Sequence, residues 1–191
     1  MAVVFTEAGL ATNSAGWSGW SLVMRFEPSA FTPPGGFSTA DALRFTFRGP
    51  TNATQTQIAN CAFGHAPASG GNFYDFDTVQ PHKRQTFGGN NSIALLQNEV
   101  VPGDIIPYSW DSARPLNVAF DFTATTTILY RSVATAIYSP YQKNATGDVM
   151  TADKSGYSAV SDGCFLISQI EAFKGSKLLG RHVMSAALLA R

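Results

Sequence analysis

The segment Leu116–Thr123 alternates between apolar and polar side chains along its length. In an extended chain, one side of this segment is apolar and consists of Leu116, Val118, Phe120 and Phe122. The opposite side is mostly polar, with Asn117, Asp121 and Thr123. Such a period of two is typical of an antiparallel strand that buries one face and leaves the other in water, and it disfavours a parallel α/β sheet. We therefore predict a strand here with a solvated polar face.

Further segments show the same alternation or are rich in small apolar, β-branched and aromatic residues. They are Ser21–Glu27, Asp41–Gly49, Thr56–His65, Asn72–Asp77, Ile93–Leu96, Thr125–Tyr138 and Cys164–Phe173. Turn-forming stretches separate them at 33–36 and 88–91, and a long loop is expected over 143–162. We expect Thr125–Tyr138 to pair with the strand before it. Strands at this spacing predict an all-β fold, an antiparallel two-sheet β-sandwich of the jelly-roll kind.

Length and composition favour one such domain with little charge. A chain of 191 residues can bury a sizeable core, and only 14% of its residues are charged. The 13 basic and 13 acidic residues cancel, so no excess positive field favours nucleic acid. No apolar run approaches the roughly 20 residues of a membrane span, and the first residues lack the basic lead of a secretory signal. We expect no nucleic-acid partner, no membrane span and no export signal.

The last residues depart from the strand pattern. Apolar side chains recur there at helical spacing, at Leu178, Leu179, Val183, Met184 and Leu188. We predict a β-sandwich domain over 1–175 and an apolar tail over 176–191, which forms a short amphipathic helix or a final strand. Its apolar side needs a cover, which is either the body of this chain or a neighbouring subunit. The tail is therefore a candidate assembly element.

Aromatic side chains are the best candidates for ligand contacts. Trp17 and Trp20 stand in the segment Gly-Trp-Ser-Gly-Trp, whose glycines allow both indoles to turn toward a sugar ring. Tyr74 and Trp110 are further candidates for stacking on a carbohydrate. The competing interpretation is that the tryptophans fill the core or a subunit interface, which is the commoner place for large aromatic residues.

Other side chains offer weaker signals. The group Asn72, Tyr74, Asp75 and Asp77 reads as an exposed strand face rather than a calcium loop. His65, His82 and His182 lack the spacing of a zinc site, and we predict no metal and no cofactor. Cys61 and Cys164 are interpreted as two buried free thiols, with a disulfide between them as the alternative.

No residue pattern proposes a reaction. A Gly-x-Ser-x-Gly nucleophile elbow is missing from the sequence. The carboxylates of Glu7, Glu27, Glu99 and Glu171 form no recognisable constellation, although a pair of catalytic carboxylates can meet in space without one. We therefore predict a protein that is not an enzyme, and a hydrolase that uses carboxylates remains an alternative.

A family resemblance rests on three features of the sequence. The chain starts at Met1–Phe5 without an export signal, its alternating strands are rich in Phe, and it carries the Gly-Gly-Asn-Asn turn at 88–91. From Trp17 to Phe173 it resembles the small β-sandwich proteins of tailed-phage virions. The resemblance implies a head decoration protein, a tail or baseplate component, or a fibre module, usually in a symmetric oligomer. It supplies no motif that assigns site residues.

Together these observations lead to an expected function. We expect a non-enzymatic structural protein of a virion, assembled in the host cytoplasm, whose partners are copies of itself and other virion proteins. Assembly would use the sheet edges and the tail. The alternative is a carbohydrate-binding module or receptor-binding tip, which would contact a cell-surface glycan through its surface aromatic residues.

Overall fold

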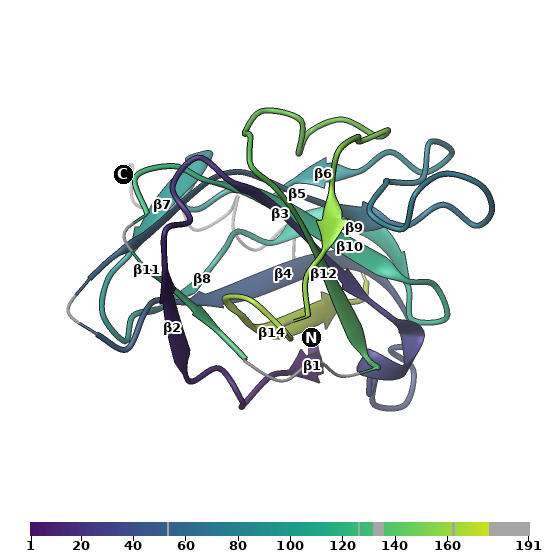
Figure 1. Ribbon diagram of the computed structural model, residues 1–191. Helices are drawn as coiled ribbons and strands as arrows, with labels where there is room; N and C mark the ends of the chain where they lie inside the picture. The colour runs from purple at the N-terminus through teal and green to yellow at the C-terminus, as the bar shows by residue number, and fades with distance from the viewer. Residues whose placement is uncertain (53, 126, 132–135, 162, 176–191) are drawn as a thin grey trace, which may run out of the picture.

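The computed structural model describes the chain except for residues 53, 126, 132–135, 162 and 176–191. The described residues form fourteen strands and one 3-10 helix, η1 (Pro28–Ala30) (Figure 1). In chain order the strands are β1 (Ala2–Thr6), β2 (Thr12–Ala15), β3 (Ser21–Phe26), β4 (Thr39–Arg48), β5 (Thr56–His65), β6 (Lys83–Arg84), β7 (Ser92–Leu95), β8 (Val100–Pro102), β9 (Ile106–Asp111), β10 (Leu116–Phe122), β11 (Thr127–Tyr130), β12 (Tyr138–Lys143), β13 (Ser158–Ala159) and β14 (Ile167–Phe173). No helix in this part of the chain has the length and apolar character needed to cross a membrane.

These strands form two main antiparallel sheets and one small sheet within the described residues. The five-stranded sheet has the order β1-β14-β4, and β8 and β9 pair one after the other with the remaining edge of β4. The seven-stranded sheet has the order β13-β12-β3-β10-β5, and β6 and β7 share the outer edge of β5. Strands β2 and β11 form the small sheet. The predicted all-β, antiparallel sandwich is confirmed.

The strongest sequence alternations lie on the strands that face each other across the sandwich. In β4, Leu43, Phe45 and Phe47 are completely buried, whereas Arg44 and Arg48 lie half-buried on the other face. Strand β3 places its own alternate apolar residues in the same core. The predicted strands Ser21–Glu27, Asp41–Gly49 and Thr56–His65 are therefore confirmed to within two residues at each end.

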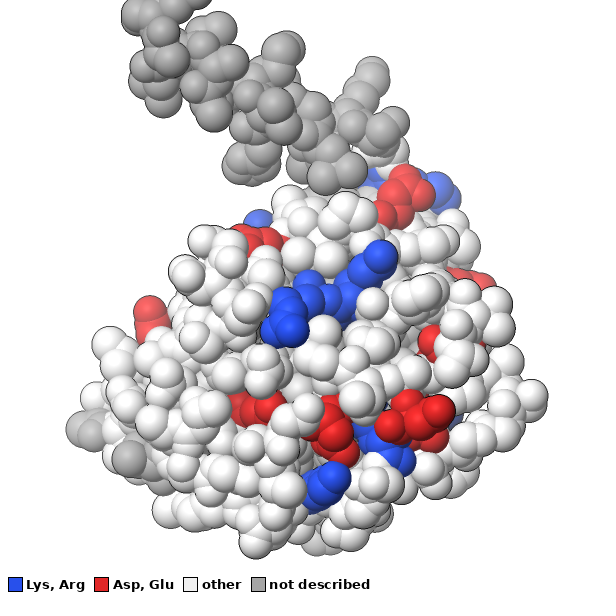
Figure 2. Space-filling model, turned by 90° about the horizontal axis from the view of Figure 1, so that it is seen from above, with Lys and Arg blue, Asp and Glu red and all other residues white. Residues whose placement is uncertain are grey.

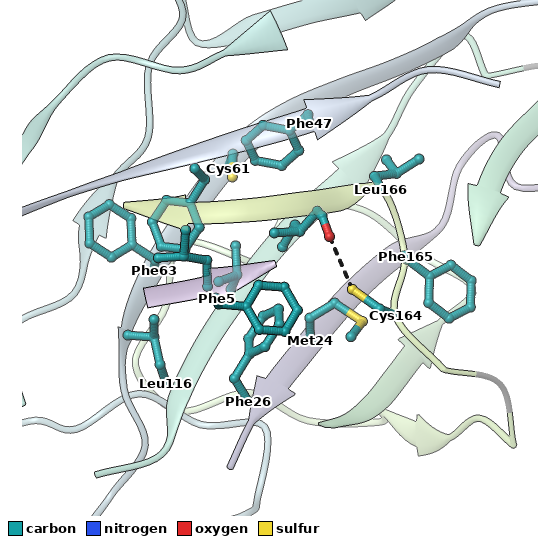
Figure 3. Packing of buried hydrophobic residues seen from close by; sticks show 14 of the residues in the cluster. Phe5, Met24, Phe26, Phe47, Cys61, Phe63, Leu116, Cys164, Phe165 and Leu166 are labelled. Atoms are coloured by element: carbon teal, nitrogen blue, oxygen red, sulfur yellow. Dashed lines mark hydrogen bonds between the residues drawn. The ribbon is translucent and has the colours of Figure 1, made fainter. Parts of the chain in front are cut away.

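The space between the sheets is filled by one large hydrophobic cluster, the main core. Figure 3 shows Phe5 of β1 and Phe26 of β3 against each other, at a ring-centroid distance of 5.0 Å. Cys61 and Cys164 lie in this core as free thiols, and Cys164 donates a hydrogen bond to the Ile167 carbonyl at 3.3 Å (Figure 3). Burial raises the pKa of both thiols. The prediction of two buried free thiols is confirmed.

The prediction that β10 exposes its polar face is wrong. Every residue of β10 is buried, because two loops, 66–82 and 144–157, cover the outer face of the seven-stranded sheet. In Figure 1 the loop between β12 and β13 is the green segment at the top. Beneath the loops lies a second hydrophobic group, which we call the outer cluster and which consists of Val23, Ala62, Phe76, Ala119, Val149 and Tyr157. Gly64 of β5 allows loop 66–82 to lie close to the sheet, since a Cβ atom at this position would be only 2.9 Å from the Cβ of His82.

Two further expectations about strands are corrected. Strand β11 pairs with β2 rather than with its predecessor β10, because both edges of β10 are already occupied by β3 and β5. The segment Asn72–Asp77 is a turn and not a strand. The Asp75 carboxylate accepts a hydrogen bond from the Asn72 amide at 2.6 Å, and such local bonds compete with strand pairing.

The turn at 88–91 has the predicted form. Phe87 and Asn90 exchange both backbone hydrogen bonds, at 2.9 and 3.1 Å, around a two-residue loop. Gly88 and Gly89 both have positive φ, 58° and 82°, as a tight hairpin turn of the primed type requires. The Asp104 carboxylate accepts hydrogen bonds from both glycine amides, which fixes the turn against the chain before β9.

Candidate functional site

The structure divides the four predicted sugar-stacking residues among different places. Trp110 of β9 is 1% exposed and packs at 5.2 Å against the ring of Phe31, so it has no free face to offer a ligand. Trp17 and Trp20 are half-buried neighbours at the margin of the main core, with ring centroids 5.8 Å apart. Tyr74 packs on the outer cluster instead. Only the tryptophan pair is thus brought together as the sequence suggested.

The tryptophan pair owes its position to two glycines and to the small sheet. Gly16 and Gly19 both have positive φ, 87° and 84°, which curls the chain between them. The Trp17 indole packs edge-on against Phe165 at 5.3 Å and donates a hydrogen bond to the Ser14 hydroxyl at 3.2 Å. Much of each indole surface therefore stabilises the core, and what remains exposed is the outer margin of the pair.

The polar residues of β10 hold the covering loops in place. Asn117 donates hydrogen bonds through Nδ2 to the carbonyls of Phe73 and Asp75, at 3.0 and 2.6 Å. Asp121 accepts hydrogen bonds from the Ser21 hydroxyl at 2.5 Å, from Asn60 Nδ2 at 3.1 Å and from the Gly147 amide at 3.2 Å. These buried side chains fix both loops to the sheet, which is a structural role.

A cation and a histidine enclose Phe76 where the two loops meet. The Lys154 ammonium lies 3.5 Å from the centre of the Phe76 ring and donates a hydrogen bond to the Thr151 carbonyl. On the Phe76 ring the His82 imidazole stacks at 4.7 Å, and its Nε2 donates to the Met150 carbonyl at 2.8 Å. Burial lowers the pKa of His82, and it lowers the pKa of Lys154 from 10.5 to about 8, although the charges of Asp75, Asp148 and Asp153 oppose the latter shift.

We predict that Lys154 makes the stability of the fold depend on pH. Between about pH 8 and pH 10.5 the unfolded chain keeps a proton that folded Lys154 has lost, so the free energy of unfolding should rise with pH. Urea unfolding of wild type and Lys154→Met at pH 7.5 and 9.5 measures this. The difference between the two proteins should shift by about 2 kcal/mol in favour of the wild type at the higher pH.

Comparing wild type with Lys154→Met also controls for the other groups that titrate at high pH. Tyr108 and Tyr157 have raised pKa values because they are buried, so ionisation of these tyrosines destabilises both proteins alike at high pH. Taking the difference removes that contribution. Equal pH profiles for the two proteins would contradict the prediction.

One exposed aromatic residue stands out on the covering loops. Phe73 is 66% exposed, yet its ring lies 5.4 Å from the Arg25 guanidinium of β3. Arg25 also forms an ion pair with Glu27 at 2.5 Å. Tyr74 and Tyr141 of β12 follow beside them, with ring centroids 5.5 Å apart. We call these five residues the Phe73 patch.

The remaining chemistry-bearing residues are engaged in the fold. No group of three or more potential metal ligands occurs among the described residues. His65 is fully buried and accepts a hydrogen bond from the Asp111 amide through Nε2, and burial lowers its pKa. The Asp75 and Asp77 carboxylates bind the Lys154 amide and Arg114 respectively, rather than lining an exposed strand face. His182 lies outside the described residues.

The carboxylates that are candidates for catalysis are likewise bound to neighbouring groups. Glu7 is buried and accepts hydrogen bonds from Tyr138 and from Arg131. Glu171 pairs with Arg44 at 2.6 Å, and the Glu99 side chain accepts a hydrogen bond from the Leu96 amide. Each carboxylate thus has a structural partner on its own part of the fold.

The predicted assembly residues of the tail, Leu178, Leu179, Val183, Met184 and Leu188, lie outside the described residues. The chain enters the tail beside the start of β4. There the Gly175 amide donates a hydrogen bond to Asp41 at 2.7 Å, and the Lys174 ammonium donates to the Gly36 carbonyl at 2.9 Å. The described chain therefore ends at a fixed point on the five-stranded sheet.

Sequence reasoning missed most of the Phe73 patch. Arg25 and Phe73 are 48 positions apart, and only the folding of loop 66–82 over the sheet brings them together. The available signal was weak, since Phe73 adjoins the candidate Tyr74 and Arg25 belongs to the polar face of a predicted strand.

No known family model matches the sequence, and no curated protein shows significant similarity to it.

Proposed function

We propose that this protein is a non-enzymatic structural subunit of a tailed-phage virion. In this proposal it forms a symmetric oligomer on the capsid or tail, assembled in the host cytoplasm, through the outer face of its five-stranded sheet. The observation that carries the proposal is the presence of exposed aliphatic side chains at both edges of that face. Exposed apolar side chains on a sheet face are available for contact with another protein.

The strand register places these side chains on the outer face. Val3 of β1 stands opposite Glu171, whose side chain lies with that of Arg44 outside the core. At the other edge, Val101 stands opposite the core residue Phe47, so its neighbour Val100 points outward. Val3 is 41% exposed and Val100 is 56% exposed. Met1, two residues before Val3, adds exposed apolar surface at that edge.

The two outer sheet faces differ in how they are covered. The seven-stranded sheet hides its outer face under its own loops and the outer cluster. Within the described residues, no corresponding hydrophobic cluster forms on the outer face of the five-stranded sheet. Ala42, Glu171 and Phe173 at the centre of that face are themselves buried, so its exposed edges are the part that favours contact with another subunit.

The charge on this face favours a second copy of the same chain. Arg44 and Glu171 pair with each other through both guanidinium nitrogens, at 2.6 and 3.0 Å. A face whose central charges compensate each other neither repels an identical face nor selects a charged partner. A twofold contact places the same residues on both subunits, so a face whose central charges compensate each other suits it. Figure 2 shows a different side, seen from above Figure 1, where the loops lie. On that side too, acidic and basic groups are scattered among uncharged residues.

We predict that Val100→Asp weakens self-association at least tenfold, because it places a charge in an apolar contact. Sedimentation equilibrium over a range of concentrations measures the effect on the full chain. Val79→Asp is the matched control, because Val79 is 89% exposed on the loops of the opposite sheet. A wild type that stays monomeric, or a Val100→Asp variant that assembles normally, would refute the proposed face. Truncation after Lys174 tests separately whether the tail takes part.

The virion assignment has its own test. Capsid, portal or tail genes beside the gene for this chain would support it, and detection of the chain in purified particles would establish it. A position within a polysaccharide-utilisation cluster would instead favour a carbohydrate-binding module.

A further inference from the structure

The Phe73 ring is exposed and at the same time held in place. Its backbone carbonyl accepts hydrogen bonds from Asn117 at 3.0 Å and from Arg25 at 3.3 Å, and both donors belong to the seven-stranded sheet. The Arg25 side chain is only 12% exposed and lies against the ring. One side of the ring therefore rests on a fixed cation while two thirds of the residue faces water. A rigid, outward-facing ring can bind a ligand without first losing conformational freedom.

Hydrogen-bonding groups lie on residues next to Arg25 and Phe73. Glu27, whose side chain is 30% exposed, offers carboxylate oxygens beside the Arg25 guanidinium. The half-buried rings of Tyr74 and Tyr141 continue the surface, and each carries a phenol hydroxyl that can donate and accept. Strand register supports the placement, because Tyr141 stands opposite Val23, two residues from Arg25 on the same face of β3. Aromatic faces and two-way hydrogen-bonding groups thus lie side by side.

We propose that the Phe73 patch is a binding site for a neutral hexose unit of a glycan. The open face of Phe73 would stack on the C–H face of the sugar ring, and Glu27 with the tyrosine hydroxyls would bind its hydroxyl groups. The neutrality of the ligand follows from the charge balance, since Arg25 and Glu27 compensate each other and leave no net charge for an anionic sugar or a phosphate. An apolar peptide would leave these polar groups without partners.

This site is independent of the proposed assembly surface. The Phe73 patch lies on the outer side of the seven-stranded sheet, whereas the proposed subunit contact uses the outer side of the five-stranded sheet. An assembled subunit would therefore still present the patch. It also differs from the tryptophan pair, which packs on the main core.

The experiment applies the full chain to a printed array of neutral hexose, deoxyhexose and N-acetylhexosamine oligosaccharides. Calorimetric titration with the bound oligosaccharide then compares wild type with Phe73→Ala. We expect at least a tenfold loss of affinity with an unchanged melting temperature, since the lost side chain is mostly exposed. Val79→Ala, an exposed apolar residue of the same loop, should bind like the wild type.

Three outcomes would overturn this proposal. They are an array without any bound sugar, equal losses in Phe73→Ala and Val79→Ala, and a preference for sialylated or phosphorylated glycans included as anionic controls. Trp20→Ala separates the two aromatic surfaces, because binding that depends on Trp20 rather than Phe73 would place the site at the tryptophan pair. None of these results bears on self-association, which sedimentation measures independently.

Discussion

Asp121→Ala is expected to lower the free energy of unfolding by about 3 kcal/mol. The side chain of Asp121 is 1% exposed and accepts hydrogen bonds from β3, from β5 and from the loop at 144–157. Alanine would remove the buried acceptor of the half-buried Asn60 side chain and of the exposed Gly147 amide. Hydrogen bonds to a charged group contribute about 1.5–3 kcal/mol each, and water can replace part of this at Gly147. The Ser21 hydroxyl can turn to the Ala145 carbonyl at 2.7 Å, which limits its share of the loss. Urea unfolding followed by circular dichroism measures the effect.

The part of the chain that Asp121→Ala loosens distinguishes the loss of these hydrogen bonds from a general loss of stability. Hydrogen exchange should show early opening of the loop at 144–157, since its Gly147 amide is bound to Asp121. Glu99→Ala is the matched control, because Glu99 is an exposed carboxylate that accepts a backbone hydrogen bond from Leu96. The control should lose less than about 1 kcal/mol. If Asp121→Ala is as stable as Glu99→Ala, the polar residues of β10 do not secure the loops.

The alternation of side chains in the sequence predicts the strand β10 correctly. It does not predict that loops cover the outer face of this strand. A period of two shows which residues share a face, and Val118 and Phe120 do share the main core. It does not show whether the other face meets water or a loop. Segments that form loops in the structure cover Asn117 and Asp121. A polar side chain that anchors a loop and one that faces solvent look the same in a sequence.

Local hydrogen bonding explains why the segment Asn72–Asp77 is not the strand that its pattern predicts. Alternation over this segment has the same form as in β4, but Asp75 and Asn72 can close a turn through their own side chains and amides. The Asn117 side chain on β10 then donates a hydrogen bond to the Asp75 carbonyl of this turn. The Lys154 amide of the neighbouring loop donates to the Asp75 carboxylate. Such partners are far away in the chain, so propensity alone could not identify them.

The candidate site shows the same limit. Trp110 and Tyr74 were predicted to stack on a sugar from their residue type alone. The size of an aromatic ring does not show whether it lies in the core or on the surface. Trp110 lies in the core because β9 pairs with β4 and turns its alternate residues inward. Phe73 stays outside because its loop turns just before the buried Phe76. The exposure of these rings is decided by tertiary contacts and not by the local pattern.

Phe63→Ala is expected to lower the free energy of unfolding by about 3–5 kcal/mol, a loss at least as large as that of Asp121→Ala. Phe63 of β5 is completely buried and joins the two sheets. Its ring lies 4.8 Å from that of Phe45 in β4 and 5.3 Å from that of Tyr108 in β9. Removing it leaves a cavity between β5, β4 and β9. Neighbouring backbone is held in both sheets, so the cavity cannot fully collapse.

Phe73→Ala is the matched control for this change, because it removes the same side chain from a position that is 66% exposed. The control should lose less than about 1 kcal/mol, since little apolar area leaves water when Phe73 folds into place. Urea unfolding with intrinsic fluorescence compares the two variants at one pH, and both must show the same dependence on urea for the comparison to hold. A loss of similar size in both would mean that the sheets are not joined through Phe63, and that the loop carrying Phe73 contributes as much to the fold as the main core.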